Sequence, residues 1–288
     1  MSVTNLGNTS SVIRVRPGVV EKRPHNYKTP QLQDSVATSF AVERQILEHL
    51  GDHPRIVRYL GQSPDDPRAL LLGEASHSDL QTYLDKHPEP PPPGQALRWC
   101  RQAAEAVAYI HSRGVLHCDL RPANLLVERD AYQSDVDDAD DADDHGASVV
   151  SLSLRLADFG GSVCSALSLD GGGLASTPFW HPVLGHTESV ALDLFGLGSL
   201  MYVIFTARWP YKDTPGRPGT IEAREAYEAL VDPLLLAEQY PRNVDCLPVG
   251  AVIRRCWTRG YATADEVVQD LAGVFVGETT RREVIRRG

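Results

Sequence analysis

The chain has 288 residues, of which 42% are hydrophobic and 23% charged, so it is long enough for one large or two small cores and too apolar for disorder throughout. Its formal net charge of −10 is concentrated in residues 128–144, which hold nine acidic side chains and one basic side chain. The rest of the chain is nearly neutral and, apart from the C-terminal RREVIRRG, has no basic cluster that would indicate nucleic-acid binding.

The cysteines and the apolar stretches exclude further classes. The five cysteines are scattered without a Cys-x-x-Cys pair, which argues against a disulfide framework or a zinc site and favours a reducing compartment. The N-terminus lacks a basic start followed by an apolar core, and the most apolar stretch, residues 190–205, contains Asp193. We therefore expect an intracellular protein with no membrane contact, cytoplasmic by default, with the nucleus left open.

In chain order, the first predicted elements are strands around one helix. Alternation in residues 11–16, followed by a Pro-Gly turn and residues 18–24, predicts a hairpin. Apolar residues near helical spacing over 37–50 predict a helix that ends at Gly51. Residues 55–61 and 69–74 are typical of two more strands.

From residue 78 onward the pattern is mainly helical. A short helix over 79–87 ends at the proline run 88–94, an extended connector, and a long helix follows over 95–114. After the acidic segment, the sequence predicts a strand over 153–159, a glycine-rich loop over 168–177 and helices over 189–207, 220–231, 249–257 and 263–275. A small sheet-rich part therefore precedes a large helical part.

One short stretch, GVLHCDLRPANLLV, combines three polar residues with chemistry in common. It contains Asp119, Arg121 and Asn124, and Asp158 follows in LADFGG at the end of a predicted strand. Carboxylate and amide oxygens suit Mg²⁺, and magnesium suggests a nucleotide. Phosphoryl transfer needs a positioned hydroxyl and cancelled phosphate charge, and Asp119 and Arg121 suit these two roles.

At these residues the sequence resembles the eukaryotic protein kinases over almost its whole length. The family motifs His-Arg-Asp-Leu-x-x-x-Asn and Asp-Phe-Gly stand here as HCDLRPAN and DFG, in the same order. Further matches are ERQILEHLGDHPRIVRYLG and DLFGLGSLMY. The catalytic-loop motif alone also fits small-molecule kinases, but the first further match favours a protein kinase.

The resemblance implies a two-lobed α+β fold with ATP and Mg²⁺ between the lobes. The small β-rich N-lobe with one main helix spans residues 1–74, and the larger, mainly helical C-lobe spans 75–288. Asp119 is implied to orient the substrate hydroxyl and take its proton, while Asn124 and Asp158 bind magnesium. Arg121 takes the place of a lysine that contacts the transferred phosphate.

Lys22 and Glu43 match the family's phosphate-binding lysine and its ion-pair partner. The alternative is that both are surface charges, and Lys28 is the second choice for the lysine. Glu74 and Ala75 fall at the hinge where adenine docks. That alignment makes Gly73 the residue that limits access behind the adenine, unless it is shifted by one position.

Asp79 is placed to reach the ribose, or only to cap the helix that follows it. The phosphate-covering loop departs from the family pattern, because GNTSSV keeps Gly7 and loses the other glycines. Cys118 replaces the arginine that docks a phosphorylated activation loop, so control by that switch is not expected. Thr177 is expected beside the substrate and Asp119.

Two further positions lose a family ion pair together. Val183 and Tyr261 occupy the places of its glutamate and arginine, and we expect apolar packing in its stead, since losing only one partner would strand a buried charge at a cost of about 3–5 kcal/mol. The acidic stretch, about residues 129–149, is an insertion, because thirty-nine positions separate Asp119 from Asp158. It is a tolerated surface loop or a docking site for a basic partner.

The predicted function is Mg²⁺-dependent transfer of the γ-phosphate of ATP to a serine or threonine of a protein substrate. Pro122 resembles serine/threonine kinases, whereas Arg121 also occurs in some tyrosine kinases. The alternative is a pseudokinase that holds partners or nucleotide without turnover, which the lost glycines and Cys118 favour.

Overall fold

The structure, a computed structural model, describes residues 3–6, 9–130, 151–173, 175–184 and 189–274. Gly7 and most of the predicted insertion, residues 131–149, therefore lie outside the described residues.

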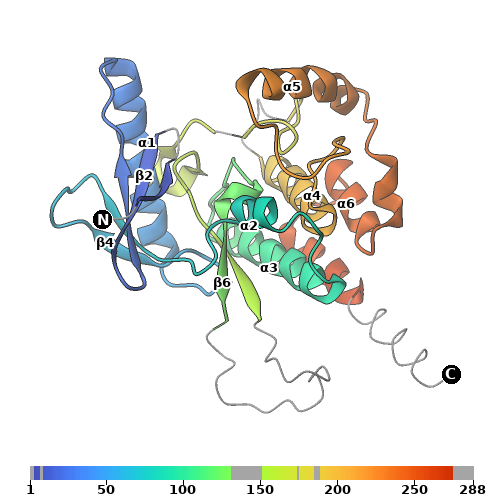
Figure 1. The fold of residues 1–288 in the computed structure, drawn as a ribbon, viewed down its shortest axis with the longest axis horizontal. Helices are drawn as coiled ribbons and strands as arrows, with labels where there is room; N and C mark the ends of the chain where they lie inside the picture. The colour runs from blue at the N-terminus through green and yellow to red at the C-terminus, as the bar shows by residue number, and fades with distance from the viewer. Residues whose placement is uncertain (1–2, 7–8, 131–150, 174, 185–188, 275–288) are drawn as a thin grey trace, which may run out of the picture.

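The N-terminal part is a five-stranded antiparallel sheet, at the left of Figure 1. The predicted hairpin is confirmed, because Val12 lies opposite Lys22 and Arg14 opposite Val20. A further strand precedes it that the sequence pattern did not predict. In spatial order the strands are β1 (Val3–Leu6), β2 (Ser10–Arg16), β3 (Val19–Pro24), β5 (Leu70–Gly73) and β4 (Tyr59–Gln62).

Helix α1 (Pro30–Leu50) stands beside this sheet (Figure 1). It begins at Pro30 rather than at residue 37, because a proline suits the first turn, where its missing N–H has no helical partner. Gly51, with φ of 67°, ends it as expected. Phe40 and Ile46 lie on its buried face, and so does the carboxylate of Glu43.

The C-terminal part is mainly helical. Helix α4 (Val190–Thr206) is buried from residue 192 to residue 204 and packs between α3 (Pro93–Ser112) and α6 (Gly250–Trp257). Helix α5 (Ile221–Leu236) runs past its predicted end at residue 231. Among the described residues, no helix combines the length and the apolar character needed to cross a bilayer. The helices are α2 (Leu80–Lys86), α3 (Pro93–Ser112), α4 (Val190–Thr206), α5 (Ile221–Leu236) and α6 (Gly250–Trp257), followed by helical residues 264–274.

Two small hairpins lie between these parts. Strands β6 (Leu125–Arg129) and β7 (Leu152–Leu156) form the first, and β8 (Val163–Cys164) and β9 (Leu169–Asp170) form the second. Leu156 also bonds to the chain before β4, since its carbonyl accepts from the Val57 N–H at 2.8 Å.

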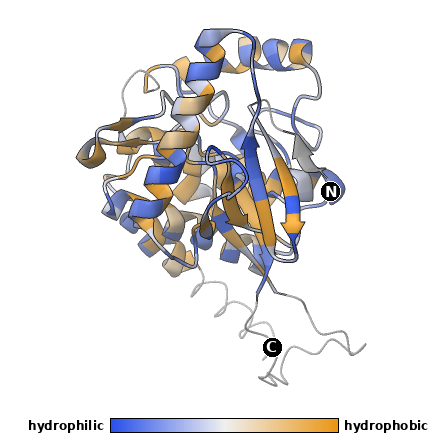
Figure 2. Ribbon diagram, turned by 90° about the vertical axis from the view of Figure 1, so that its left-hand side faces the viewer, coloured by the Kyte–Doolittle hydropathy of each residue, from blue (hydrophilic) through white to orange (hydrophobic). Residues whose placement is uncertain are grey.

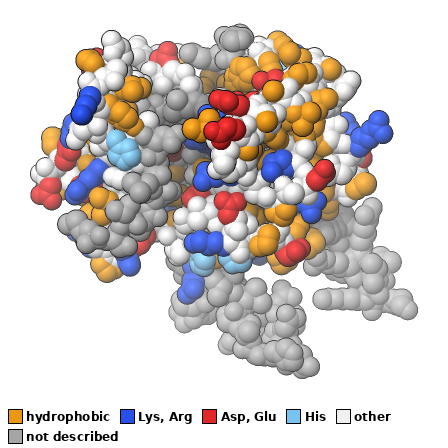
Figure 3. Space-filling model, turned by 45° about the horizontal axis from the view of Figure 1, so that its top comes forward, with side chains coloured by type: hydrophobic (Ala, Val, Ile, Leu, Met, Phe, Trp, Pro, Cys, Tyr) orange, Lys and Arg blue, Asp and Glu red, His pale blue; other side chains and the backbone are white. Residues whose placement is uncertain are grey.

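One continuous core joins the parts, from Val20 in the sheet to Leu271 in the helical residues 264–274. Figure 2 shows hydrophilic and hydrophobic residues mixed on the strand-rich side, and Figure 3 shows basic side chains spread singly over a second face. The molecule thus has the two-lobed α+β architecture expected from the sequence. The division at residues 74 and 75 stays a prediction.

Candidate active site

Three charged residues far apart in the sequence meet between the sheet and the helical part. Lys22 on β3 places its Nζ 2.7 Å from Oε2 of Glu43 on α1 and 2.8 Å from Oδ1 of Asp158. The Glu43 side chain is only 1% exposed, whereas that of Asp158 is 42% exposed and open to a ligand. The reading of Lys22 and Glu43 as surface charges is wrong.

Burial and mutual attraction set the charge states here. Burial opposes the Lys22 ammonium, but Asp158 and Glu43 outweigh it and raise its pKa. Partial desolvation by the surrounding protein also opposes ionisation of Asp158, yet the nearby ammonium of Lys22 keeps the pKa of this carboxyl below its usual value. For Glu43, burial dominates and raises the pKa above its usual value. Lys22 and Asp158 are therefore charged at neutral pH.

A buried carboxylate of α4 holds the loop that carries Asp119. Asp193, 1% exposed, accepts hydrogen bonds from the backbone N–H of His117 at 2.8 Å and of Cys118 at 2.9 Å. His111 places its Nε2 2.8 Å from the same carboxylate. Sequence reasoning missed Asp193, although a lone acid in so apolar a stretch signals a buried partner.

Asp119 has one carboxylate oxygen engaged and one free. Oδ2 accepts from Nδ2 of Asn124 at 3.0 Å and lies 3.2 Å from Nη2 of Arg121. Oδ1 is buried and has no hydrogen-bond partner among the described residues. Burial raises the pKa of Asp119 to about 7, with Arg121 acting in the opposite direction. The free oxygen can accept a proton.

Asn124 and Asp158 suit a magnesium ion. The Asn124 side chain donates its NH₂ to Asp119, which leaves its carbonyl oxygen as an acceptor. The Asn124 backbone carbonyl accepts from the Ala157 N–H at 2.9 Å, so it lies beside the Asp158 segment. One carboxylate oxygen and one amide oxygen are the hard ligands that Mg²⁺ prefers.

The sequence matches a known family over most of the chain. A family model described as "Protein kinase domain" covers residues 8–258. The chain belongs to the protein kinase family. The relatives of this kinase domain include the serine/threonine-protein kinase pkn2 of Myxococcus xanthus, 27% identical over 187 residues, which are 62% of this chain and 20% of that protein.

Mitogen-activated protein kinase kinase kinase 7 of Homo sapiens is 26% identical over 235 residues, 78% of this chain and 33% of that protein. Serine/threonine-protein kinase ATG1b of Arabidopsis thaliana is 28% identical over 189 residues, 63% of this chain and 23% of that protein. The kinase domain thus spans about a fifth to a third of these relatives.

The residues predicted to lie beside adenine make contacts within the protein. Glu74 accepts from the Gly18 N–H at 3.0 Å and pairs with Nε of Arg14 at 2.9 Å, which fixes the turn between β2 and β3. A Cβ on Gly73 would lie 3.2 Å from Cβ of Arg58, so Gly73 faces Arg58 on the chain leading into β4. Ala75 follows, half-buried.

Asp79 is the N-cap of α2. Its Oδ1 accepts from the Thr82 N–H at 2.9 Å and its Oδ2 from the Thr82 hydroxyl at 2.7 Å, so both oxygens are used. In this conformation the capping alternative accounts for the residue, and contact with a ribose stays a prediction.

The environments of three residues in the kinase domain differ from those expected from the sequence. Thr177 donates its hydroxyl to Oδ1 of Asp232 on α5 at 2.5 Å, and not to Asp119, beside which it was expected. The expectation of apolar packing at Val183 is wrong, because that residue is 56% exposed. Tyr261 is buried but polar in its contacts, since its hydroxyl bonds to Asp270 at 2.7 Å.

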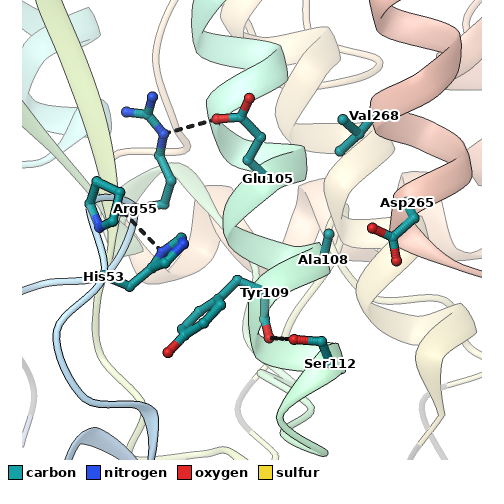
Figure 4. Close-up of a pocket in the computed structure, with 9 residues that line it drawn as sticks. His53, Arg55, Glu105, Ala108, Tyr109, Ser112, Asp265 and Val268 are labelled. Atoms are coloured by element: carbon teal, nitrogen blue, oxygen red, sulfur yellow. Dashed lines mark hydrogen bonds and ion pairs between the residues drawn. The ribbon is translucent and has the colours of Figure 1, made fainter.

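A cavity of about 380 Å³ lies away from this site, between the segment before β4, α3 and the helical residues 264–274 (Figure 4). The His53 and Tyr109 rings stack at 3.7 Å in its wall, and Arg55 pairs with Glu105 at 3.0 Å. It contains none of the residues predicted for catalysis. The residues predicted for catalysis lie instead around Lys22, Asp119 and Asp158.

Proposed function

We propose that this kinase domain transfers the γ-phosphate of ATP to a serine or threonine hydroxyl of a protein substrate, with Mg²⁺ as cofactor. The observation that carries the proposal is Lys22 bridging Glu43 and Asp158, with the free Oδ1 of Asp119 nearby. Phosphoryl transfer depends mainly on positioning and charge stabilisation, and these groups can supply both.

Each residue has a defined part in the reaction. The substrate hydroxyl attacks the γ-phosphorus, the bond to the bridging oxygen breaks, and ADP leaves, while Oδ1 of Asp119 takes the hydroxyl proton. Lys22 holds phosphate oxygens, and Arg121 stabilises charge beside Asp119. Asn124 and Asp158 would hold Mg²⁺, which neutralises charge on the phosphates when bound.

The hydroxyl class is argued from the sequence and the relatives. Pro122 follows Arg121 in the catalytic loop, a pattern that resembles serine/threonine kinases. Relatives from a bacterium and a plant carry the name serine/threonine-protein kinase. Both features support serine or threonine over tyrosine.

The test is transfer of labelled γ-phosphate to generic protein substrates, followed by identification of the labelled amino acid. Asp119→Asn removes the proton acceptor at nearly unchanged volume and should lower transfer by about 10²–10⁴-fold. The matched control is Asp265→Asn in the cavity of Figure 4, which should transfer like the wild type.

Equal transfer by Asp119→Asn and the wild type would show that Asp119 is not the proton acceptor. A wild-type protein that binds ATP, as measured by thermal shift with and without Mg²⁺, but transfers phosphate to no substrate would contradict the proposal. The protein would then be a nucleotide-binding scaffold. The loss of glycines in GNTSSV is the feature that favours this second candidate.

A further inference from the structure

The segment after the Asp-Phe-Gly motif is fastened through backbone atoms. We call residues 163–173 and 175–181 the activation segment. Its first part pairs with the catalytic loop, because Leu116 and Val163 exchange two backbone hydrogen bonds of 2.9 Å. Its later part returns to the same loop, where the Ala175 N–H donates to the Cys118 carbonyl at 3.0 Å.

A second set of backbone bonds folds the segment onto the metal motif. The Gly171 N–H donates to the Ser162 carbonyl at 2.9 Å, and the Gly173 N–H to the Gly161 carbonyl at 3.2 Å. Asp170 stabilises the turn by accepting from the Gly172 N–H at 2.7 Å. Residues 171–173 therefore run directly against residues 160–162.

Only glycine permits so close an approach. A Cβ on Gly171 would lie 2.3 Å from the Gly160 carbonyl oxygen and 2.7 Å from Cα of Gly161. These neighbours are backbone atoms that no side-chain rotation can move. Gly160 is less confined, since the atom closest to its added Cβ, at 2.2 Å, is the rotatable Oγ of Ser39 on α1.

Charge contributes little to this fastening. Asp170 is the only Asp, Glu, Lys or Arg between residues 163 and 181, and Cys118 stands at the start of the catalytic loop where the resemblance places a cation. Cys118 is 3% exposed and its Cβ would lie 3.8 Å from a Cβ on Gly173. Packing and the backbone hydrogen bonds above therefore contribute to the contact between the described part of the segment and the loop.

We infer that Gly171 is a positioning residue, whose missing side chain lets the activation segment close on the metal motif and the catalytic loop without any phosphate on the segment. The inference rests on the proposed function for its kinetic consequence. Close packing at a glycine then holds the activation segment in place, as phosphorylation does in proteins where a cation binds the phosphate. The unphosphorylated protein is then already arranged for its acceptor.

The direct test is hydrogen exchange on full-length protein after phosphatase treatment. The amides of Gly171, Gly173 and Ala175 should exchange slowly in the wild type and rapidly in Gly171→Ala. Gly219→Ala is the matched control, because no atom lies within 4 Å of its added Cβ and its backbone needs no positive φ. Rapid exchange in the dephosphorylated wild type would overturn the inference.

The kinetic test separates positioning from general damage. Gly171→Ala should lower transfer to a protein acceptor by about a hundredfold, because a displacement near 1 Å can have that effect. Binding of an ATP analogue with Mg²⁺ and the melting temperature should change little. Loss of all three together would mean a structural role only and would overturn the assignment.

Phosphate itself is tested with the triple variant Ser165→Ala, Ser168→Ala and Ser176→Ala, which should transfer like the wild type. Activity that disappears in this variant, or after phosphatase treatment, would contradict the inference while leaving the kinase proposal intact. Slow exchange at the three amides in a protein that transfers to no substrate would leave the closed segment intact and reject the proposed function instead.

Discussion

At the scale of single residues, the protonation of Asp119 should control the rate of transfer. Burial raises its pKa to about 7, so the carboxyl is protonated below that pH and cannot take a proton. We expect kcat/KM to fall as the pH drops through neutrality. Arg121→Gln removes the cation that lowers this pKa, so the acidic limb should move to higher pH, measured as a pH profile of both proteins. A limb that stays in place would contradict the coupling.

The same raised pKa predicts a stability effect. The folded protein keeps a proton on Asp119 up to about pH 7, whereas the unfolded chain releases it near 3.8, so this contribution to stability is present below the unfolded pKa and lost as the pH rises through the folded value. Asp119→Asn removes the buried charge. It should raise the free energy of unfolding above pH 7 more than near pH 4, as measured by urea titration at both pH values.

Lys22 should matter for stability as well as for ATP. Lys22→Met leaves the buried Glu43 without its counter-ion and should lower the free energy of unfolding by about 3–5 kcal/mol. The control is Arg44→Ala, which breaks an exposed pair with Glu48 and should change stability by less than about 1 kcal/mol. Denaturant titration compares them, and equal losses would show that the buried pair has no special weight.

At the scale of elements, α5 is coupled to the activation segment through Thr177 and Asp232. Asp232→Ala removes the acceptor of the Thr177 hydroxyl, a bond to a charged group worth about 1.5–3 kcal/mol. We expect KM for the protein acceptor to rise roughly tenfold with kcat and ATP binding unchanged. Asp232→Asn keeps an acceptor oxygen and should remain near the wild type. Equal KM values for both variants and the wild type would rule the coupling out.

The elements also show where sequence reasoning succeeds and fails. A continuous apolar run predicted α4, which is buried on all sides from residue 192 to residue 204, and helical spacing of apolar residues predicted α6, each within a residue or two. The sequence pattern missed the first turns of α1, where Pro30 starts a helix through polar residues, and it ended α5 before Pro233. Tertiary contacts decide such ends, since buried Leu235 holds α5 beyond its proline.

Some residues of the candidate site could likewise be predicted from the sequence, and others could not. Asp119, Asn124 and Asp158 were named because oxygen chemistry and motif spacing indicated them, and the structure brings them together with Lys22 and Glu43. Gly7 lies outside the described residues. Long-range partners were not readable from sequence. Asp193 accepts from the backbone of His117 and Cys118, which lie 76 and 75 positions earlier in the chain, and Asp232 accepts from Thr177, which lies 55 positions earlier.

At the scale of the whole molecule, most of the net negative charge lies in a stretch of sequence outside the described folded part. Seven of the acidic residues lie between positions 131 and 150, so a body that is nearly neutral carries one strongly acidic segment. The two ends of that segment are close, because the Asp130 N–H donates to the Ser151 carbonyl at 2.9 Å and Arg129 pairs with Leu152. The fold thus presents the segment at the end of the β6–β7 hairpin and does not need it to join the strands.

Replacing residues 131–150 by Asn-Gly, a tight-turn pair that suits a hairpin, should therefore leave the fold and transfer to generic substrates intact. Closing a tenfold shorter loop costs less entropy, so the free energy of unfolding should stay equal or rise by up to about 2 kcal/mol. Denaturant titration and labelled-phosphate transfer measure both. A scrambled acidic segment of equal length is the control. Loss of transfer to basic acceptors alone, restored by the scrambled segment, would assign the segment to charge-based docking, whereas loss of folding would contradict its reading as an insertion.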